Sequence, residues 1–91
     1  MDDVRQQIFA KVYSGEERMQ KQITVIVERE GDGYVSLCPE LDIASQGDSV
    51  EEARNNLREA VELFYEMASP QEIETRLHHE VYITQMEVAV G

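Results

Sequence analysis

Hydrophobic residues alternate with other side chains along residues 22–28, where Ile23, Val25 and Val27 share one side of an extended chain. A period of two is typical of a β-strand. Residues 30–33 then bring two glycines, which tolerate the positive φ angles of tight turns. The pattern therefore predicts a strand that leads into a hairpin.

The return strand of this hairpin is predicted over residues 34–38. Pro39 cannot donate a hydrogen bond to a neighbouring strand, so we expect it to end this strand or to lie at its edge. A short third strand is predicted over residues 41–46, and Gly47 closes it.

Residues 50–67 change to the period of a helix. Ser49 with Glu52 three residues later has the spacing of a capping box at the start of a helix. The apolar side consists of Ala53, Leu57, Ala60, Val61, Phe64 and Met67. The opposite side consists of Glu51, Arg54, Asn55, Arg58, Glu59, Glu62 and Glu66. A helix of about five turns with one apolar side is expected to lie on a sheet.

The remaining segments are shorter or less distinct. Ser69 as a cap and Pro70 at the first helical position predict a second, short helix that runs to about His79. Residues 81–90 predict a last strand, whose apolar positions change phase, as in a bulge or a strand buried on both faces. Residues 1–21 fit either a short strand or a helix, and the pattern does not choose between them.

This order of elements predicts an α+β fold, in which one long amphipathic helix lies across one face of an antiparallel sheet. We expect a single domain over residues 1–91, with an N-terminal extension at 1–21, a core motif at 22–67, and the short helix and last strand at 68–91. The exposed sheet edges favour a homo-oligomer, and pairing of the last strand with another subunit's sheet would cover one such edge.

The charge of the chain adds a preference for certain partners. Nineteen acidic residues stand against eight basic ones, a formal net charge of −11. Residues 28–80 hold fourteen acids and four arginines, a local net charge of −10, whereas residues 1–27 are balanced. Such a surface repels phosphate backbones and attracts basic partners, so direct binding of nucleic acid is not expected. Solubility alone is an equally good explanation of the acidity.

The cellular location follows from absences. A single cysteine, Cys38, leaves no internal disulfide possible, as is usual in a reducing cytoplasm. No apolar run approaches the roughly 20 residues of a membrane span, and the first residues do not resemble a signal peptide. We therefore expect a soluble cytoplasmic protein that does not contact the membrane.

The residues that might support catalysis or a cofactor are poorly placed for it. Gly31 and Gly33 lie in a hairpin without a nearby lysine, which disfavours a nucleotide site. His78 and His79 are adjacent and point apart, which disfavours a metal site. Cys38 has no base near it in sequence. We expect no metal, no cofactor and no catalytic residues.

Three short motifs, in a specific order, resemble the HicB-like antitoxin family. They run from Gly33 to Leu41 (GYVSLCPEL), from Gly47 to Ala53 (GDSVEEA), and over residues 56–60 (NLREA). The resemblance implies a β-β-β-α-β fold, a partial RNase H-like domain without the catalytic acids of that fold. It also implies binding and blocking of a small, basic, mRNA-cleaving toxin of the HicA type.

The resemblance is incomplete in two places. Many family members have Pro-Gly where this chain has Asp42 and Ile43. Family antitoxins often carry a C-terminal ribbon-helix-helix or helix-turn-helix domain, whereas only residues 81–91 remain here. Repression through operator DNA is therefore not expected.

These observations together predict a non-enzymatic acidic binding domain that neutralises a basic protein by direct contact. The predicted contact residues are Glu40, Asp42, Glu51, Glu59, Glu62 and Glu66. One alternative is a stand-alone HicB-like protein with another binding role and no toxin. Another is a vestigial nuclease that holds Mg²⁺ with acids such as Asp42 and Asp48.

Overall fold

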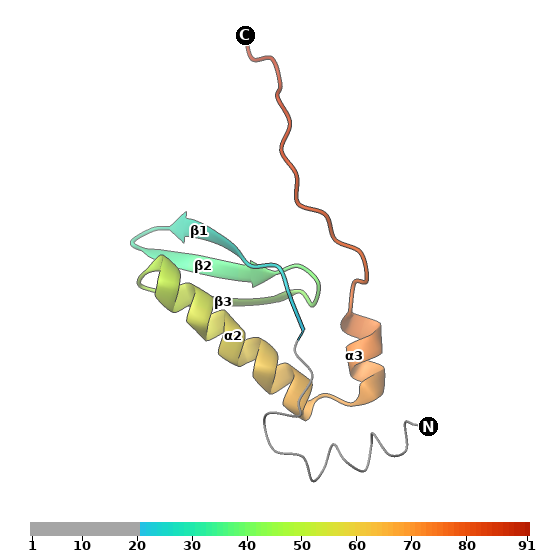
Figure 1. The fold of residues 1–91 in the computed structure, drawn as a ribbon. Coiled ribbons are helices and arrows are strands. Elements are labelled where there is room, and N and C mark those ends of the chain that lie inside the picture. Colours follow the sequence, from blue (N-terminus) through green and yellow to red (C-terminus); the bar gives the residue numbers. More distant parts are fainter. Residues whose placement is uncertain (1–20) are drawn as a thin grey trace.

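The computed structural model describes residues 21–91, which form a three-stranded antiparallel sheet with a long helix across one face (Figure 1). The strands lie side by side in the order β1-β2-β3, and the α+β class is confirmed. The elements are β1 (Ile26–Glu30), β2 (Gly33–Cys38), β3 (Ile43–Gly47), α2 (Val50–Met67) and α3 (Pro70–Arg76). The strand or helix considered for the N-terminal extension falls outside the described residues, apart from Lys21.

The hairpin between β1 and β2 is confirmed. Ile26 pairs with Leu37 at its open end, and Glu30 pairs with Gly33 next to the turn. Gly31 has a φ of 60°, and it is the first of the two turn residues. A positive φ at that position is a feature of the type I′ and II′ turns that suit twisted hairpins.

The first strand begins later than the alternation of residues 22–28 suggests. Residues 21–25 are not paired in the sheet, and β1 starts at Ile26. The amide and hydroxyl of Thr24 instead donate to the side chain of Glu40 at 3.0 and 2.6 Å. The Thr24 amide is thus bonded to a carboxylate and not to the backbone of a neighbouring strand.

The third strand also begins later than predicted, at Ile43 rather than residue 41. The amides of Leu41 and Asp42 both donate to the carbonyl of Cys38, which closes a turn that contains Pro39 and Glu40. Asp42 has a φ of 60°, a conformation outside a strand. Leu41 is fully buried in this turn, so its apolar character serves the core and not a strand.

Helix α2 has the predicted bounds, because both its start and its period are local properties of the sequence. The Glu52 amide donates to the Ser49 hydroxyl at 3.0 Å, as the capping box requires. The Glu52 carboxylate, however, accepts from the amide of Asp48 at 2.7 Å, one residue before the expected partner.

The core lies between α2 and β2. It consists of Cys38, Leu41, Leu57 and Val61, all buried. Ala53 is also buried, and its carbonyl accepts from the hydroxyl of Ser36 at 2.7 Å across the helix–sheet interface. The last turn of the apolar side leaves this interface, since the side chain of Met67 is 74% exposed.

Helix α3 begins with a complete capping box between Ser69 and Glu72, as predicted, but it ends at Arg76 and not at residue 79. Its end is fixed to the turn that precedes β3. The Arg76 guanidinium donates to the carbonyls of Leu41 and Asp42, at 2.9 and 3.2 Å. The amide of His78 donates to the carbonyl of Glu40 at 2.7 Å.

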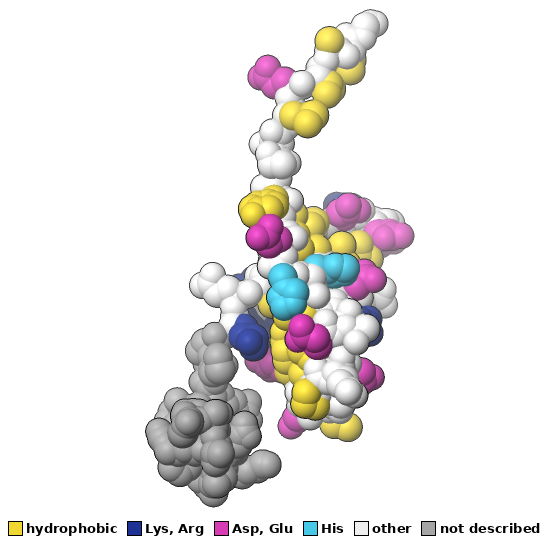
Figure 2. All heavy atoms as spheres, turned by 90° about the vertical axis from the view of Figure 1, so that its right-hand side faces the viewer, with side chains coloured by type: hydrophobic (Ala, Val, Ile, Leu, Met, Phe, Trp, Pro, Cys, Tyr) yellow, Lys and Arg dark blue, Asp and Glu magenta, His cyan; other side chains and the backbone are white. Residues whose placement is uncertain are grey.

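The predicted last strand is wrong for the described chain. Residues 81–90, here called the arm, belong to no sheet, and they extend away from the body (Figures 1 and 2). Figure 2 shows hydrophobic side chains along their length. The composition of the arm favours a strand, but a strand also needs a neighbour for its backbone groups, and none of residues 21–80 supplies one.

Gly47 provides a test of the contact between the sheet and the start of α2. A Cβ atom at this position would lie 2.5 Å from the amide nitrogen of Ala53 and 2.8 Å from the carbonyl carbon of Glu52. We expect Gly47→Ala to lower the free energy of unfolding by about 2–3 kcal/mol, because backbone atoms must move apart. Urea denaturation followed by circular dichroism measures this change. Gly91→Ala is the matched control, since its Cβ meets nothing within 4 Å; equal stability of the two variants would contradict this packing.

Candidate protein-binding surface

Four glutamates lie on the side of α2 that faces away from the sheet. Glu51, Glu59, Glu62 and Glu66, here called the acidic face, are all exposed. Successive residues turn by about 100°, so these four fall opposite the buried Ala53 and Leu57. None of them forms an ion pair with another residue between 21 and 91. Within residues 21–91, no basic side chain pairs with these carboxylates, so their charge is available to a partner.

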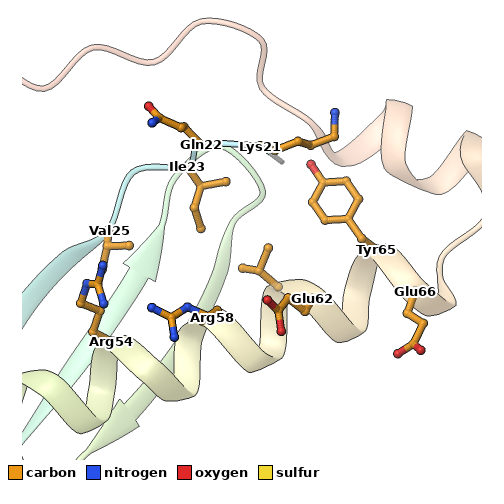
Figure 3. A pocket seen from close by; sticks show the side chains of 10 residues that line it. Lys21, Gln22, Ile23, Val25, Arg54, Arg58, Glu62, Tyr65 and Glu66 are labelled. Carbon is orange, nitrogen blue, oxygen red and sulfur yellow. The ribbon is translucent and has the colours of Figure 1, made fainter. Parts of the chain in front are cut away.

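A shallow groove borders the acidic face (Figure 3). The segment 21–25 forms one wall, and α2 forms the other with Arg54 and Arg58 beside Glu62 and Glu66. The groove was missed in the sequence because residues 22–25 were assigned to the sheet. Arg54 and Arg58 lie on the polar side of α2, as predicted, and they place positive charge next to the glutamates of the acidic face.

Tyr65 stands at one end of this groove. The ammonium of Lys21 lies 5.9 Å from the centre of its ring, close enough for a cation–π contact. Burial raises the pKa of the Tyr65 hydroxyl, and the nearby Cys38 and Glu40 raise it further. Tyr65 is therefore a neutral hydrogen-bonding and packing group at neutral pH.

The remaining two predicted contact residues lie elsewhere, in the turn between β2 and β3. Asp42 is exposed, and its backbone carbonyl is bonded to Arg76. Both oxygens of the Glu40 carboxylate accept from Thr24, and the thiol of Cys38 lies 3.5 Å from one of them. The six residues thus fall into two groups, and within the turn Glu40 has an internal structural role.

The environment of Glu40 favours its ionised form. Burial raises the pKa of this carboxyl, but the hydrogen bonds from the Thr24 side chain and amide lower it by more, so the pKa lies below its ordinary value. The neighbouring thiol behaves differently. Burial raises the pKa of Cys38, and the adjacent Glu40 raises it further. Cys38 is thus a protonated core residue at neutral pH and a poor nucleophile.

The geometry does not favour the metal-binding alternatives. Asp42 and Asp48 lie at opposite ends of β3, which separates them by roughly 15–20 Å at the rise of a strand. One Mg²⁺ ion cannot bind both side chains at that separation. His79 lies 3.8 Å from Glu74, and within residues 21–91 no three His, Cys, Asp or Glu residues are grouped as metal ligands.

The sheet with a single long helix and an acidic outer face defines an α+β protein with a charged surface on one side. Among known proteins, the chain is 51% identical over 45 residues to UPF0150 protein ssr1765 of Synechocystis sp.. This similarity covers 47% of the chain and 57% of the relative, so the chain spans little more than half the length of that protein. No known family and no solved structure matched the chain.

The helices between residues 21 and 91 are α2 and α3. No helix in that part of the chain has the length and apolar character to cross a bilayer.

The bond between Thr24 and Glu40 yields a pH-dependent prediction. A carboxyl whose pKa is lowered by folding contributes stability above its ordinary pKa, and this stability is lost as the pH falls through the lowered value. We expect Thr24→Val to cost about 1 kcal/mol of unfolding free energy near neutral pH, because it removes the 2.6 Å hydroxyl bond.

Urea denaturation at a series of pH values tests this prediction. The difference between Thr24→Val and wild type should shrink in acid, where Glu40 is protonated in both proteins. Thr75→Val is the control, because Thr75 is exposed on α3, away from Glu40 and from the arm. A cost that stays constant down to acid pH would refute the assignment of this bond to an ionised Glu40.

Proposed function

We propose that this protein is a non-catalytic, antitoxin-like binding domain of the HicB-like type. It acts in the cytoplasm as a homo-oligomer, and it neutralises a small basic mRNA-cleaving toxin of the HicA type by direct contact. The exposed acidic face of α2 is the observation on which this proposal depends.

The electrostatic argument concerns the sign and position of the charge. Residues 28–80 have a net charge of −10, and the four glutamates of the acidic face lie on one rigid helix. A toxin that binds RNA presents a basic surface, because it must attract phosphates. A rigid array of carboxylates competes for that same surface and increases the rate of encounter.

The sequence resemblance supports the same class of protein. The relative in Synechocystis is a UPF0150 protein, and UPF0150 is a HicB-like family. The motifs that carry the resemblance build the hairpin, the turn after Pro39 and the start of α2. They specify the fold and leave the outer face of α2 free to vary, so the partner is a separate proposal.

The second candidate function is a HicB-like protein with a binding or regulatory role and no toxin. The groove favours this second candidate, because Arg54 and Arg58 place positive charge beside the acidic face. The two candidates differ in the partner they require. The first candidate requires that the reading frame next to this gene encode a basic protein that this chain captures, and the second does not.

Charge reversal on the acidic face tests the first candidate. We expect Glu59→Lys combined with Glu62→Lys to slow association with the neighbouring basic protein by about tenfold at low salt, since the attraction becomes repulsion at the contact. The dissociation rate should change less. Surface plasmon resonance at two or more salt concentrations measures both rates.

A matched variant separates local contact from total charge. Glu74→Lys with Glu80→Lys changes the net charge by the same amount, at exposed positions outside α2. It should slow association clearly less than the change on α2. Equal effects of the two pairs would remove the acidic face from the contact, and the absence of any basic partner would leave the second candidate.

A further inference from the structure

The arm is the part of the described chain whose side chains have the least contact with the body. Tyr82, Met86, Val88 and Val90 are 79%, 82%, 70% and 88% exposed. Its side-chain hydrogen bonds are local, from Tyr82 to Glu80 and from Thr84 to Gln85. Large apolar side chains exposed on an extended segment mark a surface for a partner, because a neighbouring strand would take them out of water and pair the backbone groups.

Residues 84–90 of the arm have the arrangement of a strand with one apolar face, and Val81 and Ile83 near its root lie on the opposite side. Tyr82, Met86, Val88 and Val90 occupy even positions and share one side of an extended chain. Gln85 and Glu87 lie on the other side. The arm therefore has both the backbone and the side-chain pattern of a strand that is missing its neighbour.

The sheet offers two outer strands, and they differ in accessibility. β3 lies next to α2, and Asn56 of that helix donates to the carbonyl of Gln46 at 2.8 Å. The start of α2 also packs against Gly47. β1 is the strand farthest from α2 in Figure 1, and within residues 21–91 only β2 pairs with it. The outer edge of β1 is thus the more open of the two.

The root of the arm is fixed at the turn that precedes β3. Arg76 and His78 hold the end of α3 to the turn that precedes β3, through bonds to the carbonyls of Leu41, Asp42 and Glu40. From that anchor the arm runs outward, and β1 runs in another direction (Figure 1). Along the path drawn in Figure 1, the arm does not run beside its own β1.

We propose that residues 81–90 pair with the outer edge of β1 in a second copy of this chain, and that two copies exchange their arms reciprocally. Each exchange adds a strand to a sheet, and it covers the apolar side of the arm and the open edge of β1 together. A reciprocal exchange closes the assembly at two copies. This proposal gives the self-association in the proposed function a physical form, and it does not depend on a basic partner.

Substitutions in the arm test whether it holds the copies together. We expect wild type to sediment as a dimer at micromolar concentration. Met86→Asp with Val88→Asp should raise the dissociation constant by about a hundredfold or more, because two apolar side chains lose their burial. Gln85→Asp with Ala89→Asp is the matched control, since it adds the same two carboxylates on the opposite side of the arm. Circular dichroism should be close to that of wild type for each variant, since these side chains do not pack in the body.

Pairs of single substitutions identify the edge and the copy. Chains with Glu28→Cys in β1 are co-expressed with differently tagged chains that carry a cysteine substitution at Thr84, Gln85, Glu87 or Val88. A disulfide between the two tags is expected for at least one arm position. Gln46→Cys in β3 is the control edge and should give none. Cys38 is buried and should stay unmodified.

Three results would overturn the proposal. The first is a monomeric wild-type chain, and the second is a dimer that persists unchanged in the aspartate variant. The third is a disulfide that forms only when both cysteines are in one chain, which would show that the arm folds back on its own sheet. The aspartate variant keeps the acidic face, so loss of the dimer with retained capture of a basic partner would separate this proposal from the proposed function.

Discussion

Glu40 joins three segments of the chain that no regular secondary structure brings together. Its carboxylate accepts from Thr24 ahead of β1, and its backbone carbonyl accepts from His78 beyond α3. Glu40 itself lies in the turn that buries Leu41 against the helix. One turn therefore holds the segment before β1, buries Leu41 in the core and anchors the root of the arm.

The helix and the hairpin were predictable because their signals are local. Ser49 and Glu52 mark the start of α2, the apolar period runs through Ala53, Leu57 and Val61, and Gly31 accommodates the positive φ of the hairpin turn. Each of these effects acts within a few residues. None of them depends on residues far away in the sequence, so the bounds of α2 agree with the prediction.

The bonds that cross the chain were not predictable in the same way. Thr24 and Glu40 are 16 residues apart, and neither residue type indicates that the other is its hydrogen-bond partner. Leu41 was assigned to a strand because an apolar residue suits both a strand and a buried turn, and Asp42 gives no sign of its positive φ. The groove was missed for the same reason, since it exists only where residues 21–25 leave the sheet. The acidic face follows from helical period, but Glu40 was grouped with it on charge alone.

The arm was predicted to be a strand from its apolar residues. Such residues indicate an extended chain, but they leave open which sheet the chain joins. Alternating apolar residues specify an extended chain with one face to bury, and they do not specify whose sheet receives it. The two proposed contact surfaces differ in kind. The acidic face would act through charge, which salt screens over about 10 Å, whereas an exchanged arm would act through buried apolar area and backbone bonds, which salt leaves almost unchanged. The groove and the acidic face belong to α2, and the arm leaves from α3, so assembly of two copies does not require the charged surface. A dimer of this form would present two acidic faces on one rigid body, and each could meet a basic partner independently of the other.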